Sequence, residues 1–445
     1  MSQLRNEMFF GARSLMRENW LGRRLERRLS LSEQQTPEQL LAMQQRLLHR
    51  SLTAAISSLP YYAGQRLDFA PEQAADVLRS RFPVVDKMTL REHSTALYPA
   101  GGRPKPWQPV GKTSGTTGSP LVVFRSMESV MMENAFIKRH WGWSGYRDGM
   151  RRATLRGDIV APLERRTPPY WFYNRYDHQL LLSSRHLLEA CVDPLIDELE
   201  RFQPHLLQAY PSTAYALAQF LQRRQRYLKI PFLFSASEPL YPHQRELIVE
   251  RLGCTVMDMY GMAERVAFAT QCEHGSMHIN PDYSYVEILD DDGKPTDGDG
   301  YIVGTTLHNL AMPLVRYRLS DRSRWRPGAC PCGRHFPMIE AVTGKLEDAI
   351  TGGDGESVSP SVLTFAFKGV SGIRKSQVAQ IGPAHWEIRL VPDAGFSATD
   401  EQQLRDNVRT LVDSQVKLDI SLHDSLPNTA AGKFRWVVNE YSAGK

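Results

Sequence analysis

The sequence predicts an α/β fold in which a large N-terminal domain of sheets sandwiched by helices precedes a small α+β C-terminal domain. Three observations support this prediction. The chain has 445 residues, enough for roughly two to four domains at ~100–200 residues each. Hydrophobic residues make up 42% of it, which suffices to bury a substantial core. Short β-branched or aromatic runs alternate with helical stretches, as in proteins whose sheets are covered by helices.

The first well-signalled element is a helix over residues 36–58. Thr36-Pro37 followed by Glu38 is a typical helix start, because a hydroxyl caps the first amides and proline fits the first turn. Leucines then recur at helical spacing, at Leu40, Leu41, Leu47 and Leu48.

Residues 1–30 combine apolar side chains with seven arginines. The apolar part consists of Phe9, Phe10, Leu15, Trp20 and Leu21, and arginine stands at positions 5, 13, 17, 23, 24, 27 and 28. Two interpretations are open. The segment is either a helix that makes peripheral contact with an anionic membrane surface, or a solvated basic helix that packs its apolar face on the body of the protein. We expect the second.

The middle of the chain alternates strand-like and helical segments. Strands are predicted at 121–125, 255–260, 283–289 and 301–307, and helices at 186–201, 212–228 and 242–252. From residue 344 a Gly- and Ser-rich stretch precedes strands at 378–382, 386–392 and 417–422 and a helix at 399–414. The sequence therefore predicts a boundary between a large domain, residues 1–343, and a small C-terminal domain, residues 344–445.

The composition indicates which kinds of binding partner and which cellular compartment to expect. The formal net charge of +5 is small and the charges occur in mixed runs, which argues against nucleic acid as the principal partner. Five cysteines are too few and too unevenly spaced for a secreted disulfide framework. No segment approaches the roughly 18 apolar residues that a spanning helix needs. We therefore expect a cytoplasmic protein, and the sequence does not predict its oligomeric state.

A loop rich in hydroxyls and glycine is the first candidate binding element. Its glycines allow backbone amides to approach an anion, and its hydroxyls supply further donors to phosphate oxygens. It is not the P-loop of GTPases, because the Gly-Lys-Ser/Thr ending is absent. A flexible linker is the alternative interpretation. The candidate phosphate ligands are Thr113, Ser114, Gly115, Thr116, Thr117 and Gly118.

Together with this loop, three later segments resemble the adenylate-forming superfamily, which includes acyl-CoA synthetases, adenylation domains and luciferases. These segments are DMYGMAE (258–264), RYRLSD (316–321) and PNTAAGKFR (427–435), in the family's order. The resemblance implies a nucleotide-binding large domain, a mobile small domain and a reaction that uses ATP and Mg²⁺.

The resemblance also implies roles for single residues. The ring of Tyr260 would lie against adenine, Asp258 would face the adenine edge, and Asp321 would bond both ribose hydroxyls. Glu264 would hold Mg²⁺, a hard cation that prefers carboxylate oxygens. The nucleotide site would be completed by Met259, Gly261, Ser237 and Glu238.

Within the superfamily the chain resembles phenylacetate-CoA ligases and especially the CapK-like proteins of capsular polysaccharide biosynthesis. The implied reaction is attack of a carboxylic acid on ATP with release of pyrophosphate, which leaves an acyl-AMP. The acyl group then passes to CoA, to the thiol of a carrier protein or to an amine. Fixed donors must stabilise the developing charge, so Lys433 would bridge the two reactants and Thr117 would bind pyrophosphate with the rest of its loop. The supporting strings include YPS (210–212), SASEPL (235–240) and CPCGR (330–334).

Two other functions remain open at this point. The same nucleotide site would serve an adenylyltransferase that places AMP on a cofactor or a phosphate acceptor. A third interpretation is a non-catalytic component of polysaccharide biosynthesis.

The segment Gly344–Asp348 resembles the hinge about which the family's small domain swings. The family pattern is Gly-Arg-x-Asp, and this chain carries lysine and glutamate instead of arginine and aspartate. Lysine does not reproduce the planar, bidentate pairing of arginine. The thioester-forming conformation is therefore expected to be stabilised differently.

Two short cysteine motifs suggest a metal site. Three sulfurs and one imidazole suit tetrahedral Zn²⁺. Because relatives in this branch look similar at both motifs and carry zinc there, the resemblance implies a structural Zn²⁺. His278 and His335 are competing ligands, and two buried cysteine clusters beside a solvent-facing histidine are the alternative. The predicted ligands are Cys272, His274, Cys330 and Cys332.

Overall fold

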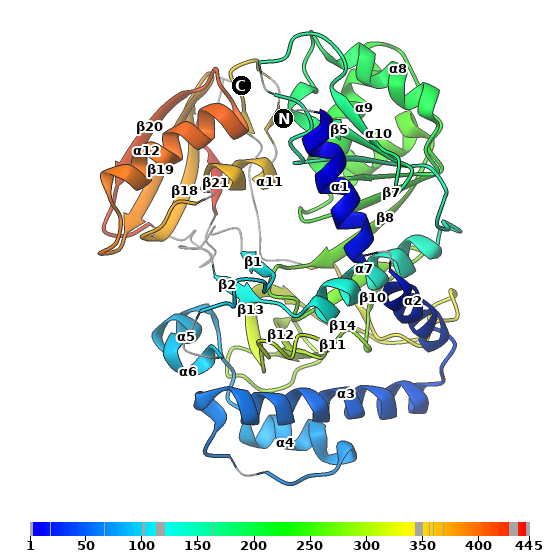
Figure 1. Cartoon of the computed structure of the whole chain (residues 1–445), viewed down its shortest axis with the longest axis vertical. Helices are drawn as coiled ribbons and strands as arrows, with labels where there is room; N and C mark the ends of the chain where they lie inside the picture. The colour runs from blue at the N-terminus through cyan, green and yellow to red at the C-terminus, as the bar shows by residue number, and fades with distance from the viewer. Residues whose placement is uncertain are drawn as a thin grey trace.

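The computed structural model describes residues 3–17, 19–65, 67–99, 103–112, 121–162, 164–342, 350–355, 357–358, 360–367, 369–426 and 435–441. Figure 1 shows a large body with the C-terminal segment beside it, packed as a separate layer of strands and helices. This arrangement confirms the predicted α/β class with a small α+β C-terminal domain. The exact boundary at residue 344 stays a prediction, because residues 343–349 lie outside the described residues.

A ten-stranded mixed sheet organises the large body. Its centre is parallel and runs β5-β3-β6-β7-β8, and antiparallel strands extend both edges, giving the order β14-β15-β10-β9-β8-β7-β6-β3-β5-β4. The bounds are β3 Arg152–Arg156, β4 Trp171–Asn174, β5 Gln179–Ser183, β6 Leu206–Ala209, β7 Phe232–Ala236, β8 Thr255–Gly261, β9 Phe268–Gln271, β10 Met277–Ile279, β14 Trp325–Arg326 and β15 Met338–Ile339.

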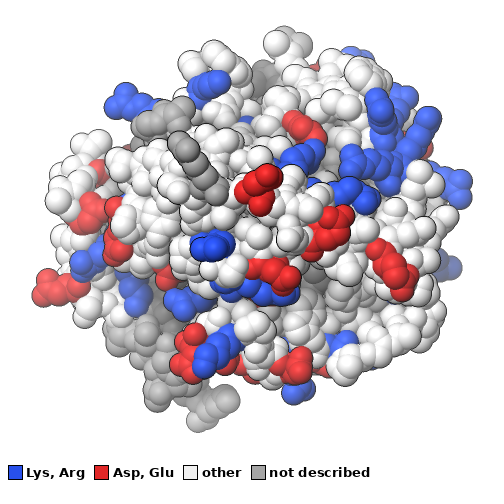
Figure 2. All heavy atoms as spheres, turned by 90° about the horizontal axis from the view of Figure 1, so that it is seen from below, with Lys and Arg blue, Asp and Glu red and all other residues white. Residues whose placement is uncertain are grey.

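Surface charge is mixed over much of the molecule. Figure 2 shows acidic and basic side chains interspersed on the face seen from below, with Lys and Arg gathered toward its right-hand edge, on the side where α2 (Trp20–Ser32) lies in Figure 1. No helix within the described residues is both long and apolar enough to cross a membrane.

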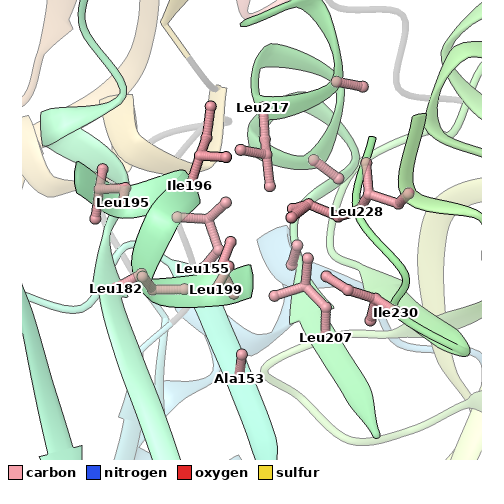
Figure 3. Packing of buried hydrophobic residues seen from close by; sticks show 14 of the residues in the cluster. Ala153, Leu155, Leu182, Leu195, Ile196, Leu199, Leu207, Leu217, Leu228 and Ile230 are labelled. Atoms are coloured by element: carbon pink, nitrogen blue, oxygen red, sulfur yellow. The ribbon is translucent and has the colours of Figure 1, made fainter. Parts of the chain in front are cut away.

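The main core lies between the parallel strands and the helices that follow them. Helices α8 (Val192–Phe202), α9 (Pro211–Arg223) and α10 (Pro242–Leu252) supply leucine and isoleucine side chains that pack on the sheet. Figure 3 shows Leu195, Ile196 and Leu199 of one helix meeting Leu155 and Leu182 from the strands. These strands are buried on both faces, as a parallel sheet between helices requires.

Three antiparallel strands and the N-terminal helices form the second part of the body. The strands are β11 Ser284–Leu289, β12 Gly300–Thr306 and β13 Tyr317–Ser323, and β1 Val110–Lys112 pairs with β2 Val122–Phe124 nearby. The helices of this part are α2, α3 Pro37–Ser58, α4 Ala74–Arg81, α5 Lys87–Glu92, α6 Ser94–Leu97 and α7 Met127–Gly142, whereas α1 Gln3–Arg17 packs on β4 of the ten-stranded sheet. The prediction for residues 36–58 is confirmed, with Thr36 as the capping residue.

The C-terminal domain is a four-stranded sheet with one covering layer of helices. The strand order is β20-β19-β18-β21, and Trp386 and Trp436 lie in its core. Its elements are β16 Ile350–Thr351, β17 Ser357–Val358, α11 Pro360–Leu363, β18 Ile373–Gly382, β19 His385–Pro392, α12 Ala398–Asn407, β20 Lys417–Leu422 and β21 Val437–Asn439.

The predicted helix boundaries differ from the structure in one instructive place. The helix predicted at 186–201 begins only at Val192, because Pro194 fits the first turn of a helix and would break an interior turn. Residues Ser184–His186 instead form a short 3₁₀ turn at the end of β5.

Candidate active site

The predicted nucleotide residues gather where the parallel strands end. Ser237 and Glu238 directly follow β7, and Asp258, Met259, Tyr260 and Gly261 form the end of the neighbouring strand β8. In open α/β sheets ligands bind outside the carboxyl ends of the strands, where the chain turns away. The topology therefore brings these two predicted segments to one edge.

Asp258 is held in place by its neighbour strand. The hydroxyl of Ser235 on β7 donates to Asp258 Oδ1 over 2.6 Å, and the backbone amide of Asp258 donates to Gln271 Oε1 over 3.2 Å. Burial raises the pKa of Asp258, while the bond from Ser235 opposes that shift. The side chain is thus fixed in orientation and easier to protonate than an ordinary aspartate.

Tyr260 and Asp321 meet across two sheets. The Tyr260 hydroxyl donates to Asp321 Oδ2 over 2.8 Å, and burial, with the charge of Asp321 second, raises the pKa of Tyr260. The other oxygen, Asp321 Oδ1, is buried and accepts no hydrogen bond from the described residues. A buried carboxylate oxygen without a donor costs free energy, so this atom is available to a ligand that brings one.

Glu264 lies in the turn after β8, beside basic and aromatic side chains. The Tyr317 hydroxyl donates to Glu264 Oε1 over 3.5 Å, and Arg125 Nη2 donates to the Ala263 carbonyl over 2.8 Å. Burial, with the charge of neighbouring Arg265 second, lowers the pKa of Arg125 to about 10. The sequence prediction did not include Arg125 or Tyr317, although Arg125 directly follows β2 and the tyrosine lies inside a recognised segment.

Gly304 on β12 allows the Glu264 turn to approach the three-stranded sheet. A Cβ atom at this position would lie 2.0 Å from the backbone oxygen of Val266. Only glycine fits such a contact, because the opposing atom belongs to the backbone and cannot rotate away.

Ser237 and Glu238 contact other strand ends. Ser237 has a φ of +74°, and Arg156 Nη2 from the end of β3 donates to its hydroxyl over 3.3 Å. Glu238 Oε2 accepts from the Ser212 amide over 3.0 Å at the start of α9. The guanidinium of Arg156 also lies 4.9 Å from the centre of the Tyr210 ring.

Several predicted site residues lie outside the described residues. These are the phosphate loop (Thr113, Ser114, Gly115, Thr116, Thr117 and Gly118), the hinge segment 344–348 and Lys433. The described residues at the two ends of segment 427–434, which contains Lys433, are Leu426 and Arg435, and both attach to β18. Lys375 Nζ donates to the Leu426 carbonyl over 2.9 Å, and Gln377 Nε2 donates to the Arg435 carbonyl over 2.8 Å.

A cleft lies where the small domain meets the large one. From the large domain it is lined by Ser184, Ser212 and Thr213, and from the small domain by Asp354, Val358 and Asp413. The hydroxyls of Ser184 and Ser212 are buried and have no hydrogen-bond partner among the described residues. The cleft therefore offers polar groups beside the start of α9, adjacent to the Glu238 contact.

The cysteine motifs come together, but the predicted histidine does not join them. The side chains that meet are Cys272, Cys330, Cys332 and His278, whose ligand atoms all lie within 4.8 Å of one another. His274 was the wrong choice, because it lies exposed in the turn between β9 and β10. His278 stands on β10, whose pairing with β9 and β15 buries its side chain beside the sulfurs.

The distances suit a tetrahedral ion. Cys272 Sγ lies 3.7 Å from Cys330 Sγ, and Cys332 Sγ lies 3.5 Å from His278 Nε2. A tetrahedron with Zn–S near 2.3 Å and Zn–N near 2.0 Å has edges of roughly 3.8 and 3.5 Å. His278 Nδ1 contacts the Phe336 carbonyl at 3.0 Å. When Nδ1 carries the proton and donates it there, Nε2 is left as a ligand, which is the usual support of a metal-binding histidine.

The chain is similar in sequence to CapK and to phenylacetate-coenzyme A ligases. Residues 350–440 match the family model of the CapK C-terminal domain. The chain is 24% identical to CapK of Staphylococcus aureus over 214 residues, covering 47% of this chain and less than half (46%) of CapK. It is 26% identical to the phenylacetate-coenzyme A ligase of Thermus thermophilus over 344 residues, covering 70% and 72% of the two chains.

A solved structure matches most of the chain. The crystal structure of 2-hydroxyisobutyryl-CoA ligase, in complex with 2-HIB-AMP and CoA, superimposes with a TM-score of 0.58 at 22% identity, covering 92% of this chain and 91% of that one. At this identity the match establishes the fold alone.

Proposed function

From its homology to CapK and to the phenylacetate-coenzyme A ligases, and from its adenylate-forming ligase fold, we propose that the chain activates a carboxylic acid with ATP. The products of this step are acyl-AMP and pyrophosphate, and the acyl group is then transferred to CoA. The relatives named as phenylacetate-coenzyme A ligases and the solved acyl-CoA ligase support the reaction class. The site residues argue for the same class independently.

One observation carries the proposal: Asp321 has one oxygen bonded to Tyr260 and the other buried without a donor from any described residue. A ribose supplies the missing hydroxyl donors. The same hydrogen bond fixes the Tyr260 ring beside the ribose site, where it can offer a flat surface to adenine. Asp258, which accepts a hydrogen bond from Ser235, lies two residues before Tyr260 on the same strand.

Charge must be compensated where the carboxylate attacks the α-phosphate, because both reactants are anions. Preorganised donors and cations at the developing charge contribute most to such reactions. We assign Mg²⁺ binding to Glu264, pyrophosphate binding to Thr117 and its loop, and the bridge between the two reactants to Lys433. Arg125, bonded to the carbonyl next to Glu264, adds fixed positive charge on the same side.

The four-residue cluster formed by Cys272, His278, Cys330 and Cys332 fits a structural Zn²⁺. The ion would tie the β9–β10 hairpin to the segment after β14, and β9 pairs with β8, which carries Tyr260. Four protein ligands leave no open position for substrate. We therefore propose that the zinc stabilises the strands that position the nucleotide-binding residues.

The decisive experiment is ATP–pyrophosphate exchange across a panel of carboxylic acids with purified full-length protein. The proposal expects exchange that depends on one class of acid and is greatly reduced in Glu264→Gln. Detection of acyl-CoA and free AMP after CoA is added completes the test. Exchange with no acid in the panel, or AMP retained on an acceptor, would contradict it.

A further inference from the structure

The N-terminal helices present an outward surface that the proposed reaction does not use. Both α1 and α2 pack against α7, and Figure 1 shows them on the same side of the molecule. Phe10 of α1 stacks on Phe172 at 5.4 Å, and Ser14 donates to Asp177 over 2.8 Å. In α2, Leu25 and Leu29 lie in a core cluster with methionines of α7. The predicted packing of an apolar face on the body is therefore confirmed.

The opposite faces of both helices are nevertheless apolar. In α2 the buried positions are 22, 25, 29 and 32, so Trp20 and Leu31 project outward on the other side. In α1 the outward side carries Met8, Phe9 and Leu15 beside Ala12. The exposed fractions are 69% for Met8, 59% for Phe9, 75% for Leu15, 73% for Trp20 and 67% for Leu31. Large apolar side chains exposed on a helix face indicate an interaction site, because a free monomer gains nothing from exposing them to water.

Arginines accompany the exposed apolar side chains of α2. Arg23, Arg24, Arg27 and Arg28 are exposed on α2, and none of the ion pairs between described residues involves them. The acids of the same helix region face inward instead, with Glu26 paired to Lys138 at 2.9 Å and Glu33 near Arg139 and Arg334. The outward face of α2 is thus both apolar and positively charged.

We propose that the outward faces of α1 and α2 dock the protein on an anionic lipid surface. A helix in a membrane interface buries its apolar side chains at the acyl boundary and pairs its arginines with lipid phosphates. Trp20 stands beside the arginines, the position that tryptophan favours at the headgroup level.

Other occupants fit the surface less well. Nucleic acid would neutralise the arginines and leave Phe9, Leu15 and Leu31 in water. A second copy of the chain in a two-fold contact would set the arginine cluster against itself. Only a partner that is negatively charged at its surface and apolar beneath it satisfies both features.

The test is co-sedimentation of the full chain with vesicles of phosphatidylglycerol and phosphatidylcholine, compared with phosphatidylcholine alone. Binding is expected only to the anionic vesicles. It should fall when salt is raised from 0.1 M to 1 M, because the screening length shrinks from ~10 Å to ~3 Å. The variants Arg24→Glu/Arg27→Glu and Trp20→Ser/Leu31→Ser should each lower the partition coefficient by roughly tenfold or more.

Matched controls separate docking from misfolding. Arg81→Glu/Arg409→Glu reverses two exposed charges on other elements, and Tyr227→Ser/Leu422→Ser removes two exposed apolar side chains elsewhere. Both should bind like the unmodified protein, and circular dichroism should be the same for all variants. Equal binding to both vesicle types, binding unaffected by the α2 variants, no binding, or a dimer that the Trp20→Ser/Leu31→Ser variant dissociates would each overturn the proposal.

Discussion

The hydroxyl of Tyr260 donates to Asp321 Oδ2 over 2.8 Å and joins the end of β8 to β13, while Asp321 Oδ1 is buried and receives no hydrogen bond from the part of the chain that the structure describes. This pair connects two segments that lie about 60 residues apart in the sequence. The pair lines the proposed nucleotide site. Its disruption is therefore expected to weaken ATP binding more than it lowers the free energy of unfolding.

Asp321→Asn should weaken ATP binding roughly tenfold to a hundredfold. The change removes the charge that strengthens the hydrogen bonds to the ribose hydroxyls, and bonds to charged groups are worth about 1.5–3 kcal/mol each. The KM for ATP in the exchange assay is the measurement. The conservative Tyr260→Phe, which removes one donor and keeps the ring, should have the smaller effect; an unchanged KM in both variants would refute the ribose role.

Lys433→Ala should lower the rate of adenylation by about two to three orders of magnitude. Loss of one preorganised donor at the developing charge typically has this effect. Single-turnover formation of acyl-AMP measures it directly. Lys417→Ala, at an exposed lysine on β20 of the same domain, is the control and should leave the rate unchanged.

His278→Asn should release zinc, whereas His274→Asn should retain it. The first change removes the imidazole that lies 3.5 Å from Cys332 Sγ, and the second alters an exposed side chain only four residues earlier. Metal content after dialysis and the midpoint of thermal unfolding are the readouts. Loss of zinc in His274→Asn, or absence of zinc from the unmodified protein, would contradict the assignment.

Protein stability should fall as the pH drops from about 6.5 to about 4. Burial lowers the pKa of His308 to about 4 and that of His140 to about 3, whereas an unfolded histidine titrates near 6.5. In this interval the unfolded chain binds protons that the folded chain excludes, so protonation favours unfolding. The loss from His308 alone is roughly 3 kcal/mol.

Urea unfolding at a series of pH values measures this loss. His308→Gln should reduce the slope of the free energy of unfolding against pH by about one proton. His243→Gln, at an exposed histidine, is the matched control and should leave the slope as it is. A slope unaffected by His308→Gln would show that other groups cause the dependence.

Gly304→Ala should destabilise the protein by about 1–3 kcal/mol or more, because the added methyl group meets the backbone of Val266. Since that backbone continues the Glu264 turn, the exchange rate should fall as well. Gly142→Ala is the control: a Cβ there meets nothing within 4 Å, and alanine favours the helix. Chemical denaturation of both variants makes the comparison.

Local signals explain which parts of this fold the sequence predicts well. The start of α3 depends on Thr36 and its immediate neighbours, and β8 and β12 were predicted almost to the residue. The start of α8 differs from the predicted one, because helical periodicity alone does not show that Pro194 favours the first turn of the helix.

The site could be predicted only where its residues belong to recognised motifs. His278 joins the cysteines through the pairing of β9, β10 and β15, which involves residues about 60 positions apart, so spacing along the chain favoured His274. Arg125 reaches the Glu264 turn by bonding to Ala263, which lies 138 positions later in the sequence. Such contacts depend on the order of the strands in the sheet, and that order is not apparent from a single sequence.

Leu426 and Arg435 are both tied to β18, on either side of the segment that contains Lys433. Both ends of the segment that contains Lys433 are therefore held by the four-stranded sheet of the small domain. Under the proposed function, a compound that binds in the cleft between the two domains, beside α9, is expected to slow acid activation without occupying the nucleotide site.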